Sequence, residues 1–161
     1  MTNSPIAAVL TLSDQGAKGL REDTSGPVIR ERLADLGIAV NEHAIQSDDT
    51  EAIVARLQGW VAEGISLIVT TGGTGFGPRD NTPEATRQVI ERDAPGLAEL
   101  MRAEGLQKTP MAALSRGICG IAGRTLIVNL PGSERAVREN LDALAPVLPH
   151  ALQLITGDTE H

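Results

Sequence analysis

Short, almost uninterrupted apolar runs alternate along this chain with longer stretches in which apolar residues recur at helical spacing. The clearest runs are residues 6–12, 67–69 and 125–129. Runs of this length are typical of strands in a parallel sheet that is covered on both faces. Residues 38–45 have a mixed pattern, which indicates a strand nearer an edge, and residues 117–123 indicate a glycine-rich hairpin or short strand.

The stretches between these runs predict helices, two of which have clear first turns. Ser25-Gly26-Pro27 and Thr82-Pro83-Glu84 place proline where its missing N–H costs no hydrogen bond, and we expect the hydroxyl of Thr82 to cap its helix. The helix that buries Trp60 is expected to be capped by Ser47 or Asp48. Further helices are predicted over residues 96–105, from Ser133 onward and around residues 152–155.

Strands that alternate with helical stretches of this length favour parallel pairing. We therefore expect one α/β domain over residues 1–161. Its fold would be a three-layer, Rossmann-like arrangement in which helices cover both faces of a mostly parallel central sheet. In such sheets ligands bind outside the carboxyl ends of the strands.

Composition narrows the classes of partner. The net charge of −7 opposes binding to nucleic acid or to an anionic membrane, and Trp60 and Phe76 are the only aromatic residues. The single Cys119 excludes an intrachain disulfide and a multi-cysteine zinc site, and we expect it to be a core thiol. The apolar run near the N-terminus is too short for a signal peptide or a membrane span, so we expect a cytoplasmic protein.

The loop after the strand at residues 67–69 has the composition of a phosphate site. Gly72, Gly73, Thr74 and Gly75 would expose successive backbone N–H groups and one hydroxyl with no bulk in front of them. The loop matches neither the P-loop nor the dinucleotide fingerprint, which disfavours kinase, ATPase and dehydrogenase functions. The alternative is a tight turn between strand and helix.

Charged residues follow this loop and one other strand. Arg79 can fork onto phosphate oxygens, whereas Asp80 in a phosphate site would repel the ligand unless a divalent cation joins them, which implies Mg²⁺. An exposed Arg-Asp pair or a turn-capping aspartate is the alternative. Asp48 and Asp49 lie at another strand-to-helix junction, where one can cap the helix and the other can bind metal. Ser115 with Arg116 indicates either a phosphate contact or a surface turn.

Six segments together resemble the molybdopterin-binding enzymes of molybdenum cofactor assembly, and in particular their stand-alone adenylyltransferases. The resemblance extends from about residue 6 to residue 157. The segments are Thr11-Leu12-Ser13-Asp14, Asp23-Thr24-Ser25-Gly26-Pro27, Thr70-Thr71-Gly72-Gly73-Thr74-Gly75, Arg79-Asp80-Asn81-Thr82-Pro83-Glu84-Ala85, Leu114-Ser115-Arg116-Gly117 and Asn129-Leu130-Pro131-Gly132-Ser133.

The resemblance implies a reaction in which ATP and molybdopterin give adenylylated molybdopterin and pyrophosphate with Mg²⁺. It also implies a homotrimer that passes its product to a separate molybdate-inserting enzyme. The family's essential acids fall on Asp48 and Asp80, which we expect to hold the metal, and the glycine loop with Arg79 is expected to hold nucleotide phosphates. The residues expected on the molybdopterin side are Ser13, Asp14, Ser115, Arg116, Pro131, Gly132 and Ser133.

A second function stays open at the level of sequence. A carrier of the same fold could hold molybdopterin without transferring a nucleotide. The two acids beside the glycine loop count against the carrier, because a carrier needs no metal-bound triphosphate. Turnover of ATP separates the two functions.

Overall fold

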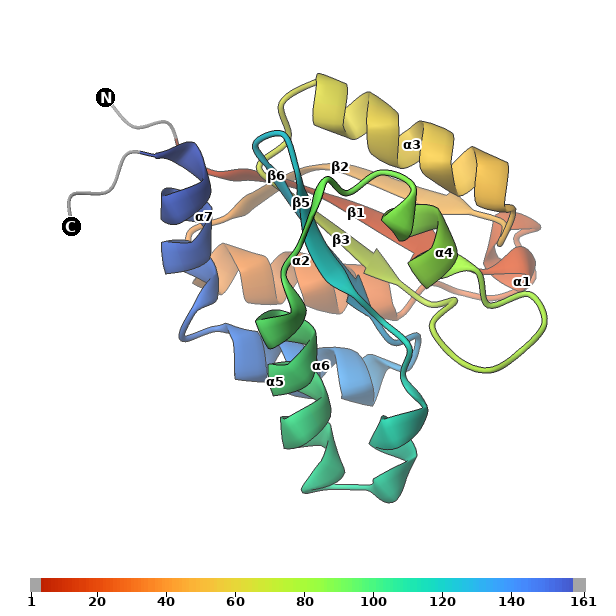
Figure 1. Ribbon diagram of the computed structural model, residues 1–161. Coiled ribbons are helices and arrows are strands. Elements are labelled where there is room, and N and C mark those ends of the chain that lie inside the picture. The colour runs from red at the N-terminus through yellow and green to blue at the C-terminus, as the bar shows by residue number, and fades with distance from the viewer. Residues whose placement is uncertain (1–3, 158–161) are drawn as a thin grey trace.

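A six-stranded sheet forms the centre of the computed structural model, which describes residues 4–157 (Figure 1). Its order is β2-β1-β3-β6-β5-β4, in which the first four strands are parallel and the last two pairings are antiparallel. The expected fold class is thus confirmed, with a mostly parallel sheet. The strands are β1 (Ile6–Leu12), β2 (Ala39–Gln46), β3 (Leu67–Thr71), β4 (Arg92–Asp93), β5 (Cys119–Ala122) and β6 (Thr125–Leu130).

Helices cover both faces of this sheet (Figure 1). Side chains of α3 and α4 pack on one face, and those of α2, α5, α6 and α7 pack on the other. Within residues 4–157, no helix combines the length and the apolar character that crossing a membrane requires. The helices are α1 (Asp14–Ala17), α2 (Ser25–Asp35), α3 (Thr50–Ala62), α4 (Thr82–Arg87), α5 (Pro95–Leu106), the 3-10 helix η1 (Pro110–Leu114), α6 (Glu134–Leu144) and α7 (Leu148–Thr156).

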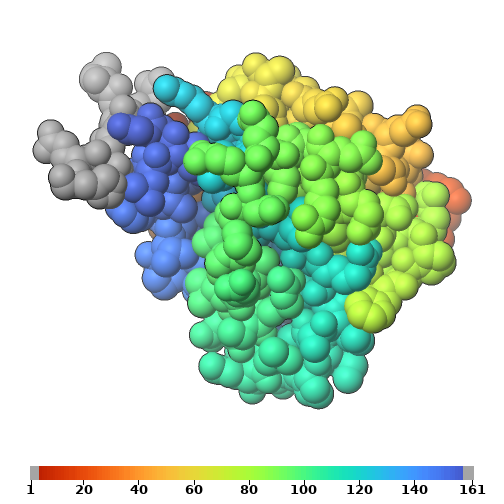
Figure 2. Space-filling model, in the orientation of Figure 1, coloured from red at the N-terminus to blue at the C-terminus, as the bar shows by residue number. Residues whose placement is uncertain are grey.

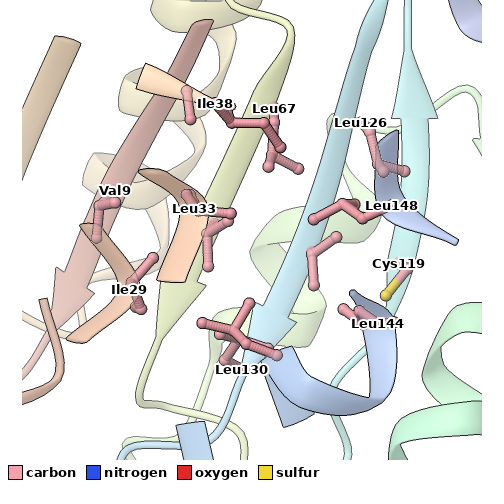
Figure 3. Close-up of a cluster of buried hydrophobic side chains, with 14 of the residues drawn as sticks. Val9, Ile29, Leu33, Ile38, Leu67, Cys119, Leu126, Leu130, Leu144 and Leu148 are labelled. Carbon is pink, nitrogen blue, oxygen red and sulfur yellow. The ribbon is translucent and has the colours of Figure 1, made fainter. Parts of the chain in front are cut away.

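The core consists of two apolar layers, because successive side chains of a strand point to opposite faces. Val9 and Leu67 belong to the layer under α2 and α6, which Figure 3 shows together with Leu33, Leu144 and the buried thiol of Cys119. The other layer holds Ile68 and Ile127 from the strands and Trp60 from α3. Every residue of β3 and β6 is buried, as expected for central strands covered on both faces.

Two of the predicted helix caps are wrong. Asp49 caps α3 by accepting a hydrogen bond from the N–H of Ala52. This contradicts the expected cap at Ser47 or Asp48 and confirms that one of the two adjacent acids caps the helix. The fully buried hydroxyl of Thr82 does not cap α4 and instead donates to the carbonyl of Gly72. This carbonyl follows the end of β3, so a tertiary hydrogen bond replaces the local one.

Short elements were missed. The helix α1, the strand β4 and the 3-10 helix η1 are not visible in the periodicity. The helix α4 ends at Arg87, so residues 89–90 pack against the core from the segment that follows it. Elements of two to six residues carry too few apolar positions to show a period. Residues 1–3 and 158–161 of the predicted domain lie outside the described residues.

Replacing Ile127 in the central strand β6 tests this core. Ile127 is fully buried, so Ile127→Ala is expected to lower the free energy of unfolding by about 2–5 kcal/mol through lost burial and a residual cavity. Urea denaturation measures the change. Leu20 is 71% exposed and serves as the control, because Leu20→Ala should change stability by about 0.5 kcal/mol or less. Equal effects of the two substitutions would contradict the burial of β6.

Candidate functional site

The loops that follow β1, β3 and β6 meet at one edge of the sheet. These strands are adjacent and parallel, so their carboxyl ends lie side by side. The N–H of Gly72 donates to the carbonyl of Leu130 at 3.1 Å, and the hydroxyl of Thr71 donates to the carbonyl of Pro131 at 2.7 Å. The three loops therefore converge at this edge, and the glycine loop after β3 lies between the other two.

Gly72 and Gly73 are required by packing as well as by any ligand. Both have positive φ angles, 96° and 70°, which side chains rarely adopt. A side-chain carbon at Gly72 would overlap the carbonyl oxygen of Leu12, and one at Gly73 would overlap the hydroxyl of Thr82. The tight-turn and phosphate-site interpretations are therefore compatible, because the turn needs glycine at the positions that leave the backbone uncovered.

Asp48 has an unsatisfied carboxylate oxygen in a buried position. Its backbone N–H donates to Oδ1 of Asp14 at 3.0 Å, and its own Oδ2 accepts from the N–H of Asp14 at 3.2 Å. Its Oδ1 is buried and has no hydrogen-bond partner among residues 4–157. Burial, with the neighbouring Asp14 charge, raises the pKa of Asp48. Since Asp49 serves as the cap of α3, Asp48 is the acid of this junction that is available for a ligand.

Arg79 is paired with a carboxylate. Its Nε and Nη2 donate to the two carboxylate oxygens of Asp14 at 3.0 and 2.9 Å. These hydrogen bonds from Arg79, followed by that from the backbone of Asp48, lower the pKa of Asp14 to about 2. The structure thus joins Asp14, Asp48 and Arg79, which come from three different loops, into one cluster.

Asp80 and Arg116 shape the loop that follows the glycines. Oδ2 of Asp80 accepts from the N–H of Gly77 at 2.8 Å. Arg116 donates to the carbonyl oxygens of Gly75 and Asp80 at 2.8 and 2.7 Å and forms an ion pair with Glu84 at 2.8 Å. The hydrogen bonds from Arg116 lower the pKa of Glu84. The guanidinium of Arg116 therefore supports the loop from its outer side.

A cavity of about 400 Å³ lies on the other side of the glycine loop, between the strand ends, α5, η1 and α6. In Figure 2 the green and teal atoms of α5 and η1 form a lobe that extends beyond the rest of the molecule, and this lobe supplies one wall. Of the predicted site residues, those that line the cavity are Thr74, Gly75, Ser115, Pro131, Gly132 and Ser133.

Other lining residues were missed by the sequence. Arg102 on α5 donates to the carbonyl oxygens of Ser115 and Gly117, at 3.3 and 2.8 Å, and Glu139 and Asn140 on α6 face the same cavity. These residues have the spacing of ordinary exposed helix positions, so no local signal distinguishes them. They become site residues only because the two helices pack beside the strand ends.

The predicted site residues thus fall into two groups separated by the glycine loop. One group contains the acids Asp14 and Asp48 with Arg79, and the other lines the cavity. Ser13 joins neither, because its hydroxyl caps α1 by accepting from the N–H of Gly16. Within residues 4–157 no cluster of three or more histidine, cysteine, aspartate or glutamate side chains could hold a metal. A cation bound here would need oxygens from a ligand as well.

Comparisons with known proteins agree on one family. A family model described as a probable molybdopterin binding domain matches residues 8–150. The chain is 42% identical over 153 residues to the molybdopterin adenylyltransferase of Helicobacter pylori, with 93% of this chain and 87% of that protein covered. The crystal structure of the molybdopterin biosynthesis enzyme MoaB from Thermus thermophilus superposes with a TM-score of 0.90 at 54% identity, covering 94% of this chain and 96% of that one.

Some relatives are much longer than this chain. The Drosophila melanogaster molybdenum cofactor synthesis protein cinnamon is 47% identical over 155 residues, which cover 93% of this chain and 25% of that protein. This chain spans between 23% and 49% of four longer curated relatives that it matches. The similarity therefore concerns one domain of those proteins.

Replacing Gly72 by alanine tests the packing of the glycine loop. The control is Gly64→Ala, because Gly64 also has a positive φ, 83°, but a side-chain carbon there would meet nothing within 4 Å. The control should lose about 1–2 kcal/mol of unfolding free energy from backbone strain alone. Gly72→Ala should lose a further 1–3 kcal/mol or so, because the backbone of β1 must move. Equal losses in urea denaturation would mean that the loop is not pressed against β1.

The titration of Asp14 tests its pairing with Arg79. In the wild type the carboxyl carbon of Asp14 should titrate by NMR with a midpoint near its lowered pKa of about 2. Because this pKa is lowered on folding, the ionised pair favours the folded state above the ordinary pKa of 3.8, and this contribution is lost as pH falls toward 2. Arg79→Ala should move the midpoint up. Arg87→Ala, which removes an equally exposed arginine elsewhere, should leave it unchanged.

Proposed function

This chain belongs to the family described as the probable molybdopterin binding domain, and we propose that it is an ATP:molybdopterin adenylyltransferase of molybdenum cofactor biosynthesis. It transfers AMP from ATP to the terminal phosphate of molybdopterin and releases pyrophosphate. The observation that carries this proposal is the division of the site. A buried, unsatisfied aspartate oxygen lies on one side of a glycine loop, and a cavity of about 400 Å³ lies on the other.

The proposal needs no activated serine or cysteine, because the attacking group is a phosphate that is already an anion. The protein must instead align this phosphate with the α-phosphate of ATP and neutralise their mutual repulsion. The glycine loop separates the two groups of site residues, so it is suited to hold nucleotide phosphates near the second substrate. Its backbone N–H groups attract anions without adding net charge to the site.

The carboxylates of Asp48 and Asp80 fit Mg²⁺. A hard cation prefers carboxylate, phosphate and water oxygens, and the buried Oδ1 of Asp48 lacks any partner within the protein. We assign Asp48 and Asp80 to this ion, with ATP supplying further oxygens. When bound, Mg²⁺ neutralises charge on the triphosphate. Asp80 would contribute a carboxylate oxygen to the ion. Its Oδ2 also accepts from the N–H of Gly77, which holds the loop that carries Asp80.

The cavity is assigned to molybdopterin. Ser115, Pro131, Gly132 and Ser133 form part of its wall, and Arg102 provides a cationic side chain. The hydroxyls of Ser115 and Ser133 accept from the N–H groups of Gly117 and Ala136, at 3.4 and 3.2 Å. Its remaining walls are largely apolar and come from α5 and η1, which suits a ring system with a polar rim. Arg116 and Ser13 support the site indirectly. Arg116 holds the glycine loop through the carbonyl of Gly75, and Ser13 caps α1.

A carrier function is less well supported. A carrier needs the cavity but has no use for a buried carboxylate oxygen that faces the glycine loop. Leaving such an oxygen unpaired costs stability. The Helicobacter pylori relative is named an adenylyltransferase. The cytoplasmic location stays a prediction from the sequence pattern. The homotrimer and the transfer of product to a molybdate-inserting enzyme stay predictions from the resemblance.

Separate substitutions of Asp48 and Asp49 by asparagine test the proposed function and show which of the two acids it requires. Purified protein is incubated with molybdopterin, ATP and Mg²⁺, and adenylylated molybdopterin is followed by mass. Asp48→Asn should slow product formation by about 100-fold or more, because an amide cannot supply the negative charge that the cation needs. Asp49→Asn should stay active, because asparagine caps a helix as well as aspartate does.

The wild-type result decides between the two functions. Formation of adenylylated product with release of pyrophosphate supports the transferase. Tight binding of molybdopterin with no product would identify a carrier. Equal losses in the two variants would remove the special role of Asp48.

A further inference from the structure

Asp14 lies where three loops of the site meet. Its backbone follows β1, its carboxylate accepts from the N–H of Asp48 after β2, and the same carboxylate binds Arg79 from the loop after β3. The residues in contact are 34 and 65 positions apart in the chain. Within residues 4–157, no other carboxylate accepts hydrogen bonds from both the loop after β2 and the loop after β3.

The contact between Asp14 and Asp48 is reciprocal. Each backbone N–H donates to the other residue's carboxylate, at 3.0 and 3.2 Å, so the two hydrogen bonds close a ring. This ring uses Oδ2 of Asp48 and leaves Oδ1 without a partner. That Oδ1 lies 3.1 Å from where a side-chain carbon on Gly73 would stand, so it faces the glycine loop. The ring therefore determines that Oδ1, and not Oδ2, of Asp48 faces the glycine loop.

Arg79 restrains Asp14 from the opposite side. Its two hydrogen bonds occupy both carboxylate oxygens, a bidentate arrangement that limits rotation of the carboxylate. The ion pair is well exposed, with 60% of the Arg79 side chain accessible, so it adds little to overall stability. Its effect is geometric: it ties the loop that carries Asp80 to the ring that holds Asp48.

Binding of substrate by these two residues is the competing role. Asp14 is an anion, and its direct contact with an anionic substrate would be repulsive. Arg79 could reach phosphate only with donors other than Nε and Nη2, or by releasing Asp14. Release would leave the Asp14 charge unneutralised beside Asp48.

We propose that Asp14 and Arg79 are positioning residues that act as a latch, holding the unpaired oxygen of Asp48 against the glycine loop. The name "latch" refers below to the hydrogen bonds among Asp14, Asp48 and Arg79. The catalytic part of this inference rests on the proposed function, in which Asp48 binds the cation of Mg²⁺–ATP. The structural part does not, because the latch is formed by the protein alone.

Substrate-free hydrogen exchange tests the structural part. The amide of Asp48 should exchange slowly in the wild type and at least about tenfold faster in Asp14→Ala, which removes its acceptor. Asp14→Asn keeps an oxygen acceptor, so its exchange rate at Asp48 should lie between those of the wild type and Asp14→Ala. Arg79→Ala should speed exchange at Asp48 although it does not touch that amide. The matched control is Arg87→Ala, because Arg87 is also 60% exposed and pairs with Asp93 elsewhere. Unchanged exchange in Arg79→Ala would overturn the latch.

Adenylylation kinetics test the catalytic part with the same variants. A latch predicts that Arg79→Ala and Asp14→Ala lower kcat about 10- to 100-fold, with a smaller change in KM for ATP, because a displaced ligand costs alignment. The double variant should be no slower than the worse single variant, because the two residues act as a unit. If Arg79 instead bound phosphate directly, its loss would mainly raise KM for ATP and would multiply with the loss of Asp14.

A binding measurement distinguishes a failure of the latch from a failure of the proposed adenylyltransferase function. Affinity for Mn²⁺–ATP, measured by electron paramagnetic resonance, should fall by a smaller factor than kcat in Asp14→Ala and Arg79→Ala and stay unchanged in Arg87→Ala. If the wild type made no adenylylated product, the proposed function would fail, while exchange at Asp48 and binding of Mn²⁺–ATP would still judge the latch. Faster exchange at Asp48 without any loss of Mn²⁺–ATP affinity or kcat would overturn the latch as a positioning device.

Discussion

Parallel pairing of β1, β3 and β6 is the constraint on which the site depends. Hydrogen bonding in register brings the carboxyl ends of the three strands to one edge. Gly72 must then pass against the backbone of β1, which admits only glycine, and its N–H donates to the carbonyl of Leu130. The glycines that follow Gly72 carry no side chain that could cover the backbone of the loop.

Charge is distributed locally rather than over the whole molecule. The chain has a net charge of −7, yet its proposed substrates are anions. The two arginines nearest the glycine loop are paired with carboxylates, Arg79 with Asp14 and Arg116 with Glu84. In the proposed function, attraction of phosphate would therefore depend on backbone N–H groups and on a cation held by Asp48 and Asp80. This arrangement concentrates positive potential at the reacting phosphates without a broadly basic surface, which would bind other polyanions.

The sequence predicted much of the fold, but it gave no indication of the contacts that several site side chains make within the protein. The long strands and the helices with apolar stripes are found where the pattern predicts them, because these features depend on residues within a few positions of each other. The pairing of Arg79 with Asp14 and the contacts of Arg116 with Gly75 join segments 65 and 41 residues apart. Contacts between segments so far apart leave no trace in local spacing, whereas the phosphate role predicted for Arg79 stays a prediction.

The amino-acid sequence alone determined the alternation of strands and helices, the glycine loop and the presence of acids at two strand ends. It also carried the resemblance that named the reaction. Only the tertiary structure decided which acid is free, because Asp49 caps α3 while Asp48 is buried against Asp14 with one oxygen unpaired. It also brought Arg102 and Glu139 to the cavity. Local spacing sets periodicity and turns, whereas hydrogen-bond partners and burial depend on how distant segments pack.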